Sequence, residues 1–122
     1  MEKKNLDWKH IGFAYHTTDY RYVADYKDGK WQEGYMSDSP NIVLNECAGI
    51  MQYCQEVFEG LKAYETADGR IVTFRSDLNA DRMYHSAERM EMPPFPKERF
   101  IEAVEKVVKA NEAWVPPYGS GA

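Results

Sequence analysis

A turn between two strand-like runs, followed at once by a helical run, is the feature that most constrains the fold of this chain. The runs 53–64 and 70–75 flank the pair Asp68-Gly69. An Asp-Gly pair in this setting predicts a β-hairpin, because glycine readily adopts the positive φ that a tight turn requires. Residues 77–90 follow without a linker and predict a helix. A hairpin that runs directly into a helix predicts an α+β fold in which the helix packs on the sheet.

The N-terminal half is expected to supply the remaining strands. Tyrosines alternate with other residues over 20–26, and after an Asp-Gly turn the run 30–36 returns, which predicts a second hairpin. Apolar runs predict two further short strands, at 11–15 and, buried, at 41–45. Residues 46–54 fit a helical turn and a strand equally well. We expect the tyrosines of the second hairpin to pack on the faces of the sheet.

The last helix is expected over residues 98–113, after the rigid, proline-rich connection 92–96. Its apolar residues recur at helical spacing and form one stripe, made of Phe100, Ile101, Val104, Val107 and Val108. Charged residues fill the opposite face. The sequence therefore predicts an α+β domain with a mostly antiparallel sheet, built from the two hairpins and the 41–45 strand, and two packed helices.

Composition and charge narrow the class of protein. At 122 residues, 43% of them apolar and 14% aromatic, the chain has the content of one globular domain, whose charged first ten residues are expected to be loosely ordered. A formal net charge of −5 provides no basic surface for nucleic acid. No apolar run approaches the roughly 20 residues that span a bilayer, and the N-terminus lacks the apolar core of a signal peptide. We therefore expect a cytoplasmic protein without nucleic-acid or membrane partners.

Neither the cysteines nor the histidines have the spacing of a metal site. Cys47 and Cys54 are separated in a way that fits neither a zinc motif nor a redox pair. His10, His16 and His85 are scattered along the chain. We predict reduced, structural cysteines and no bound metal.

The predicted helix 77–90 carries the strongest candidate for binding a ligand. Either Ser76 or Asp77 can cap its start. Residues three or four apart share one face of a helix, which defines the stripe Leu78, Arg82, Ser86 and Arg89. Arg82 is thereby held on a rigid element immediately behind a sheet, a geometry suited to binding an anion. Taken alone, however, a helical arginine is most often a solvated surface residue.

At these residues the sequence resembles a known family. The motifs that carry the resemblance are, in order, Phe58-Glu59-Gly60-Leu61-Lys62-Ala63-Tyr64, Phe74-Arg75, Asn79, Asp81-Arg82-Met83, Ser86-Ala87, Arg89-Met90 and the tail Trp114-Val115-Pro116-Pro117-Tyr118-Gly119. This string resembles the small domain of branched-chain amino-acid aminotransferases, which are pyridoxal-phosphate enzymes of fold-type IV. The resemblance covers the chain from about Phe13 to its end and is dense from Tyr53 onward. A string of motifs this long is specific, whereas any one of them would be weak.

The resemblance implies roles for four residues. Arg82 would bind the phosphate of pyridoxal phosphate, a task that suits a guanidinium because it stays charged and can hold two phosphate oxygens at once. Phe58, Tyr53 and Phe13 would wall the pocket for an aliphatic side chain. From the residues alone, Tyr53 and Phe58 are more simply core aromatics. The parent reaction would move an amino group between leucine, isoleucine or valine and 2-oxoglutarate, in a homo-oligomer.

Lys62 is not expected to be the lysine that such an enzyme bonds to its cofactor. In the family, that lysine lies in a large second domain that this chain lacks, so residues 1–122 are expected to be the N-terminal small domain and inactive alone. Glu59-Gly60 is expected to set backbone geometry rather than to perform acid–base work. An uncovered apolar patch is expected where the rest of such an enzyme would pack. Two alternatives remain: another fold-type IV enzyme, such as a D-amino-acid aminotransferase or an aminodeoxychorismate lyase, and a truncated, non-catalytic interaction domain.

Overall fold

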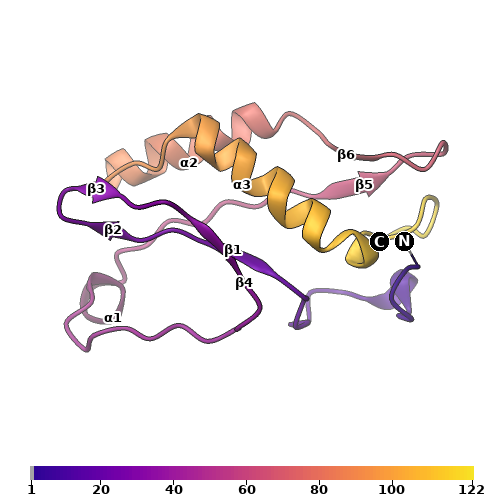
Figure 1. Cartoon of the computed structure of the whole chain (residues 1–122), viewed down its shortest axis with the longest axis horizontal. Helices are drawn as coiled ribbons and strands as arrows, with labels where there is room; N and C mark the ends of the chain where they lie inside the picture. Colours follow the sequence, from indigo (N-terminus) through magenta and orange to yellow (C-terminus); the bar gives the residue numbers. More distant parts are fainter. Residues whose placement is uncertain (1) are drawn as a thin grey trace.

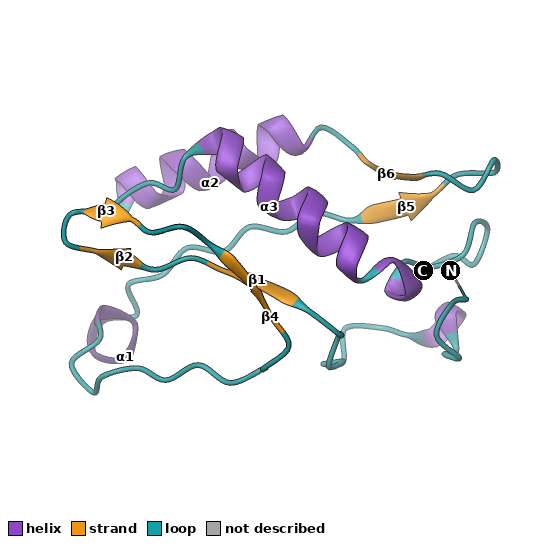
Figure 2. Ribbon diagram, in the orientation of Figure 1, coloured by secondary structure: helices purple, strands orange, loops and turns teal. Residues whose placement is uncertain are grey.

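The computed structural model describes residues 2–122, and its architecture is α+β, as predicted (Figure 1, Figure 2). The two long helices pack against each other, and the second also packs on the first strand. The elements in chain order are η1 (Trp8–His10), β1 (Arg21–Val23), β2 (Tyr26–Lys27), β3 (Lys30–Trp31), β4 (Tyr35–Ser37), α1 (Gly49–Tyr53), β5 (Ala63–Glu65), β6 (Ile71–Thr73), α2 (Ser76–Arg89), α3 (Lys97–Ala110) and η2 (Glu112–Trp114).

The first residues that the structure describes lie beside the end of the chain (Figure 1). Lys4 donates its backbone N–H to the carbonyl of Ala113 at 3.0 Å. Its side chain pairs with Asp19 at 3.0 Å, and Lys3 pairs with Glu65 at 2.6 Å. These contacts fall within the segment that the sequence predicted to be loosely ordered.

The strands pair as three short antiparallel sheets instead of the single sheet that was expected. β1 pairs with β4, and β2 pairs with β3, which together make the predicted hairpin over residues 20–36. β5 pairs with β6. The antiparallel pairing of both hairpins is therefore confirmed, while their union into one sheet is wrong.

Two expected strands do not form within the described residues. The segment 41–45 was predicted to be a buried strand, but it has no strand structure, and Val43 is 96% exposed. A strand needs a neighbour to satisfy its backbone N–H and C=O groups, and none of the described strands pairs with this segment. The segment 11–15 contains a turn, in which Gly12 has a φ of +59° and Phe13 is fully exposed. Both predictions were wrong because an apolar run does not by itself provide a pairing partner.

Between the two hairpins lies the segment for which the sequence allowed either a helical turn or a strand, and part of it is helical. Residues 46–54 contain the short helix α1, which ends before Cys54, a residue in left-handed conformation with a φ of +50°. The following run was predicted to be strand-like over 53–64, but only its last two residues enter β5.

The β5–β6 hairpin is closed by the predicted Asp-Gly turn. Gly69 has a φ of +80°, and the N–H of Thr66 donates to the carbonyl of Arg70 at 2.8 Å. Asp68 accepts a hydrogen bond from the Arg70 guanidinium, also at 2.8 Å. After β6 the chain turns through Arg75, which has a φ of +49°, directly into α2. The hairpin and the helix are thus joined without a linker.

The start of α2 is not capped as expected. The helix begins at Ser76, one residue before the predicted start, and Arg75 holds the N-cap position without a side-chain cap. Asp77 instead accepts hydrogen bonds from the guanidinium of Arg75, the shortest at 2.7 Å. The prediction of a Ser76 or Asp77 cap was wrong because Ser76 is already helical and the Asp77 carboxylate is engaged by the neighbouring cation.

α3 confirms the predicted apolar stripe. All five residues of the stripe are half-buried, whereas the charged residues opposite them are exposed, namely Glu98, Glu102, Glu105, Lys106 and Lys109. The helix ends at Ala110, short of the predicted residue 113. Within residues 2–122, no helix is both long and apolar enough to span a lipid bilayer.

The end of α3 is held by Asn111, a buried polar residue that sequence reasoning did not single out. Its Nδ2 donates to the carbonyls of Val107 at 2.9 Å and Tyr20 at 2.7 Å. Its Oδ1 accepts from the N–H of Tyr20 at 2.9 Å. The side chain thus ties the residue before β1 to the end of α3.

We expect Asn111→Ala to lower the free energy of unfolding by about 1–3 kcal/mol, because it leaves the backbone N–H and C=O of Tyr20 without their part-buried partner. Urea denaturation would measure the change. Asn5→Ala, at an exposed position, is the control and should alter the free energy by less than about 0.5 kcal/mol. Equal effects of the two substitutions would show that the Asn111 hydrogen bonds do not stabilise the fold.

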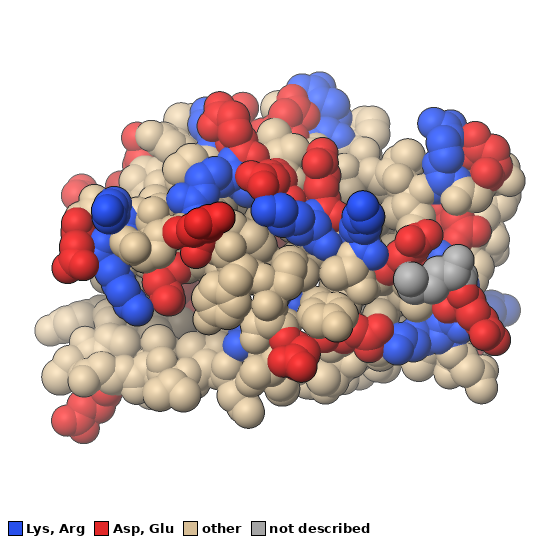
Figure 3. Space-filling model, viewed as in Figure 1, with Lys and Arg blue, Asp and Glu red and all other residues tan. Residues whose placement is uncertain are grey.

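Little of the apolar content of the chain is buried. The buried apolar residues are all small or medium-sized: Ala80, Ala87, Ala113 and Val115. Many large apolar side chains are instead strongly exposed, among them Phe13, Tyr15, Ile42, Val43, Tyr53, Phe58 and Phe74. Figure 3 shows many charged residues over the helices, while the lower left of this view, where Figure 1 places α1 and the loop after β4, is mostly uncharged. The domain presents apolar surface to solvent, as expected.

Candidate functional site

The β5–β6 hairpin brings Glu59 to the start of α2. The two strands run antiparallel, with Ala63 opposite Thr73. The residues just before β5 therefore lie beside the residues just after β6, which form the first turns of α2. Asn79 and Arg82 lie three residues apart on one face of that helix, and both donate hydrogen bonds to Glu59.

Glu59 and Arg82 form a two-pronged ion pair. Arg82 Nε donates to Glu59 Oε2 at 2.6 Å, and Arg82 Nη2 donates to Glu59 Oε1. The same Oε1 accepts from Asn79 Nδ2 and from the backbone N–H of Gly60, each at 2.9 Å. Asn79 Nδ2 also donates to the carbonyl of Gly60 at 3.0 Å. The carboxylate is thus held from both sides, by the helix and by its own backbone.

The two partners differ sharply in exposure. The Glu59 side chain is 4% exposed, whereas the Arg82 side chain is 66% exposed. The pKa of Glu59 is lowered to about 2, chiefly by the hydrogen bond from Arg82, which outweighs the opposing effect of desolvation. Hydrogen bonds from Asn79 and Gly60 contribute to the same lowering. Glu59 is therefore a permanent anion at neutral pH, shielded from solvent, beside a cation that faces solvent.

The stabilising effect of this ion pair should be constant at neutral pH and be lost in acid. Because folding lowers the pKa of Glu59 from 4.5 to about 2, the ionised carboxylate stabilises the fold above pH 4.5, and this stabilisation disappears as the pH falls through 2. Unfolding in urea at a series of pH values would measure it. Glu59→Gln should make the free energy of unfolding less dependent on pH between 4.5 and 2, and an unchanged dependence would contradict the assignment.

The outer edge of the Arg82 guanidinium is directed away from Glu59. A guanidinium has five N–H donors in a planar fork, and Glu59 uses the edge formed by Nε and Nη2. The edge formed by Nη1 and the second Nη2 hydrogen is not used by Glu59, and the side chain as a whole is mostly exposed. That edge has the geometry for two parallel hydrogen bonds to the oxygens of a phosphate or carboxylate. The residues present therefore fit an anionic group.

The predicted pocket residues are not gathered around one described cavity. Phe13 lines an open hollow of about 1100 Å³, together with Lys62, Val107, Trp114 and Tyr118. Neither Tyr53 nor Phe58 is among the residues that line this hollow.

Phe58 is the predicted pocket residue placed nearest to the ion pair, directly before Glu59, with its side chain 90% exposed. Tyr53 is 83% exposed at the end of α1. All three aromatic residues point to solvent, which contradicts the simpler reading of Tyr53 and Phe58 as core aromatics.

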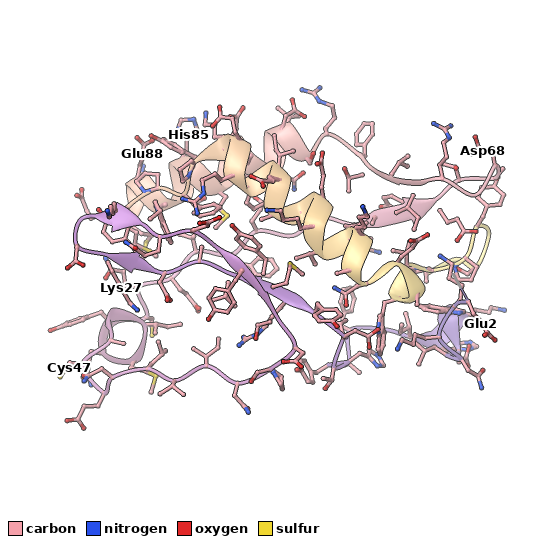
Figure 4. All side chains as sticks on the ribbon, viewed as in Figure 1. Glu2, Lys27, Cys47, Asp68, His85 and Glu88 are labelled. Atoms are coloured by element: carbon pink, nitrogen blue, oxygen red, sulfur yellow. The ribbon has the colours of Figure 1, made fainter. Side chains whose placement is uncertain are left out.

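The histidines and cysteines form no cluster in the part of the chain that is described, where no three potential ligands converge. His85 contacts Glu88 at 3.0 Å on α2, and Figure 4 shows the two side chains together. His10 similarly contacts Asp7 at 3.0 Å. Cys47 and Cys54 are free, but both are exposed, so the expected structural role is wrong.

Sequence reasoning assigned Glu59 to backbone geometry and missed its contact with Arg82. A signal was present, because Glu59 is the only charged residue in the run Val57-Phe58-Glu59-Gly60-Leu61. A carboxylate within an apolar run requires a cation or several donors when it is shielded from water. The hairpin register, which the sequence did predict, leads from this glutamate to α2.

Comparison with known proteins finds relatives of this chain that are aminotransferases. No family model matches it. It is 49% identical to a branched-chain-amino-acid aminotransferase of Haemophilus influenzae and 44% identical to one of Helicobacter pylori, each over 98% of this chain and 35% of the relative. It is also 42% identical to a methionine aminotransferase of Arabidopsis thaliana, over 96% of this chain and 33% of that protein.

The chain thus spans about a third of the length of the curated relatives it matches. Along almost its whole length it is homologous to branched-chain-amino-acid aminotransferases, which confirms the resemblance noted in the sequence.

Proposed function

We propose that residues 1–122 form the N-terminal small domain of a pyridoxal-phosphate-dependent branched-chain amino-acid aminotransferase. The observation that carries this proposal is the 49% identity to a relative of that name over 98% of the chain. The parent reaction would transfer an amino group between leucine, isoleucine or valine and 2-oxoglutarate. A cytoplasmic location remains a prediction from the sequence and is part of the same proposal.

Within this proposal, Arg82 binds the phosphate of the cofactor. Its exposed guanidinium has a two-pronged edge available, and its other edge is held by Glu59. Pyridoxal phosphate, when bound, supplies the electron sink for the transfer of the amino group, so the protein has to hold and orient it. A phosphate bound at a fixed arginine anchors one end of the cofactor, which is what Arg82 on α2 provides.

The substrate side chain would meet apolar walls that include Phe58, Tyr53 and Phe13. Their strong exposure in this domain supports the idea that other parts of the enzyme complete the pocket. A methionine aminotransferase at 42% identity makes methionine the competing substrate. The unbranched thioether side chain of methionine is apolar, like the branched alkyl side chains of leucine, isoleucine and valine, so apolar walls alone discriminate between them weakly.

The test is amino transfer by the purified full-length protein, with leucine, isoleucine, valine, methionine and D-alanine offered separately against 2-oxoglutarate. We expect kcat/KM to be highest for the three branched-chain amino acids. A preference for methionine or D-alanine would overturn the substrate assignment. Absence of both cofactor binding and turnover would favour a non-catalytic interaction domain.

Exposed apolar surface also supports a homo-oligomer. We expect residues 1–122 alone to self-associate, because Val43, Phe58 and Phe74 are each more than 80% exposed. Sedimentation velocity at a series of concentrations would measure the average mass. The double substitution Ile42→Ser and Val43→Ser should shift the distribution toward monomer, whereas Glu102→Ser on the charged face of α3 should not. A strictly monomeric chain at high concentration would contradict the prediction.

A further inference from the structure

We propose that Glu59, although it contacts no substrate, is a positioning residue that aims the Arg82 guanidinium at the cofactor phosphate. The inference rests on the proposed function, because it requires Arg82 to bind that phosphate. It goes further by assigning to Glu59, which the sequence motifs contain and for which only a backbone role was expected, a contact that orients Arg82.

The geometry of the contact supports this role. An arginine side chain has several rotatable bonds, and an exposed one ordinarily loses considerable rotamer entropy when a ligand fixes it. Glu59 removes that freedom in advance, because Oε2 and Oε1 engage two different nitrogens of the same guanidinium. Two parallel contacts set the plane of the fork as well as its position. The opposite edge is thereby presented in one orientation.

Glu59 is itself fixed, which an ordinary surface partner is not. Its side chain is 4% exposed and accepts hydrogen bonds from Asn79 Nδ2 and the N–H of Gly60, each at 2.9 Å. The exposed pair Glu102–Lys106 on α3 offers a contrast, with side chains 59% and 50% exposed and one contact at 2.6 Å. Exposed pairs of that kind contribute little and hold their partners loosely. The Glu59 contacts therefore fix the Arg82 guanidinium relative to the hairpin.

The charge of Glu59 also has a consequence for binding. An anion next to Arg82 offsets part of the attraction between Arg82 and a phosphate, so a glutamate here would be unfavourable if charge alone decided affinity. The presence of Glu59 in this shielded, hydrogen-bonded position is explained if the benefit of orienting the Arg82 guanidinium outweighs the loss of attraction for the phosphate. Glu59→Gln shows which effect is larger. Removing the offsetting charge should raise the affinity for phosphate, whereas turning one acceptor into a donor facing Arg82 or Asn79 disturbs the orientation and should lower it.

The experiment compares the affinities of the full-length apoenzyme for pyridoxal phosphate and for pyridoxal, which lacks the phosphate. The ratio of the two dissociation constants isolates the contribution of the phosphate, and it can be measured by cofactor absorbance without any assay of activity. Glu59→Gln should lower the preference for pyridoxal phosphate by roughly three- to tenfold while leaving pyridoxal binding unchanged. Glu59→Asp keeps the charge with a shorter reach and should recover part of the loss. It also serves as the test variant if Glu59→Gln does not fold. Glu102→Gln is the matched control and should leave the ratio unchanged.

A double-mutant cycle with Arg82→Ala completes the test. If Glu59 acts through Arg82, Glu59→Gln should have no further effect on the ratio in the Arg82→Ala background. An unchanged ratio in Glu59→Gln, or an equal loss with and without Arg82, overturns the positioning role and leaves the function of Arg82 standing. A ratio unaffected by Arg82→Ala overturns the assignment of Arg82 itself, and the positioning role with it.

Discussion

Arg82→Ala in the full-length enzyme should weaken binding of pyridoxal phosphate by roughly ten- to a hundred-fold, the range expected when a charged donor to a phosphate is removed. The reason is geometric as well as electrostatic. The Arg82 side chain is 66% exposed, and its outer edge can make two hydrogen bonds to one phosphate. Equilibrium titration of the apoenzyme, followed by cofactor absorbance, would measure the dissociation constant.

Two further substitutions sharpen the Arg82 result. Arg82→Lys should recover only part of the affinity, because an ammonium keeps the charge but not the two-pronged geometry. Arg89→Ala is the control, since Arg89 is also an exposed arginine of α2 and lies about two turns further along the helix. If Arg82→Ala left the affinity unchanged while the protein remained folded, Arg82 would be only a surface cation.

The elements that the sequence predicted well are those whose pattern is local. The apolar stripe of α3 has the period of a helix, and the Asp68-Gly69 turn has the backbone preference of a hairpin, so neither depends on distant residues. The 41–45 segment failed for the opposite reason. Its apolar residues predict burial against another surface, but Val43 is 96% exposed in this domain. The apolar pattern alone does not identify the surface on which such a segment packs.

The candidate site was predictable only in part, for a related physical reason. Arg82 was identified through motif resemblance, and its exposure agrees with binding a ligand. Glu59 and Asn111 were not identified, because the role of each depends on one partner far along the chain. The contact between Glu59 and Arg82 follows from the antiparallel register of β5 and β6, and that between Asn111 and Tyr20 from the packing of α3 beside β1. A buried polar residue shows that a partner must exist, but the fold decides which residue it is.

Residues 1–122 expressed alone should catalyse no amino transfer. The family's cofactor-bonding lysine is expected outside this chain, and the domain spans about a third of the relatives it matches. Arg82 could still hold a phosphate weakly, but holding the phosphate does not supply the amine that the chemistry requires. Incubation with pyridoxal phosphate, leucine and 2-oxoglutarate should therefore release no glutamate above the slow background of the free cofactor.

The same experiment tests our assignment of Lys62 as a residue that does not bond to the cofactor. Lys62 is exposed, lies directly before β5 and lines the hollow that also contains Phe13 and Trp114, so it is accessible to a small molecule. If purified residues 1–122 turned over leucine at an enzyme-like rate, Lys62→Ala would be the next variant to measure. Loss of that turnover in Lys62→Ala, with Lys109→Ala on the exposed face of α3 unaffected, would make Lys62 the catalytic lysine. Our assignment of that role to a residue beyond this domain would then be wrong.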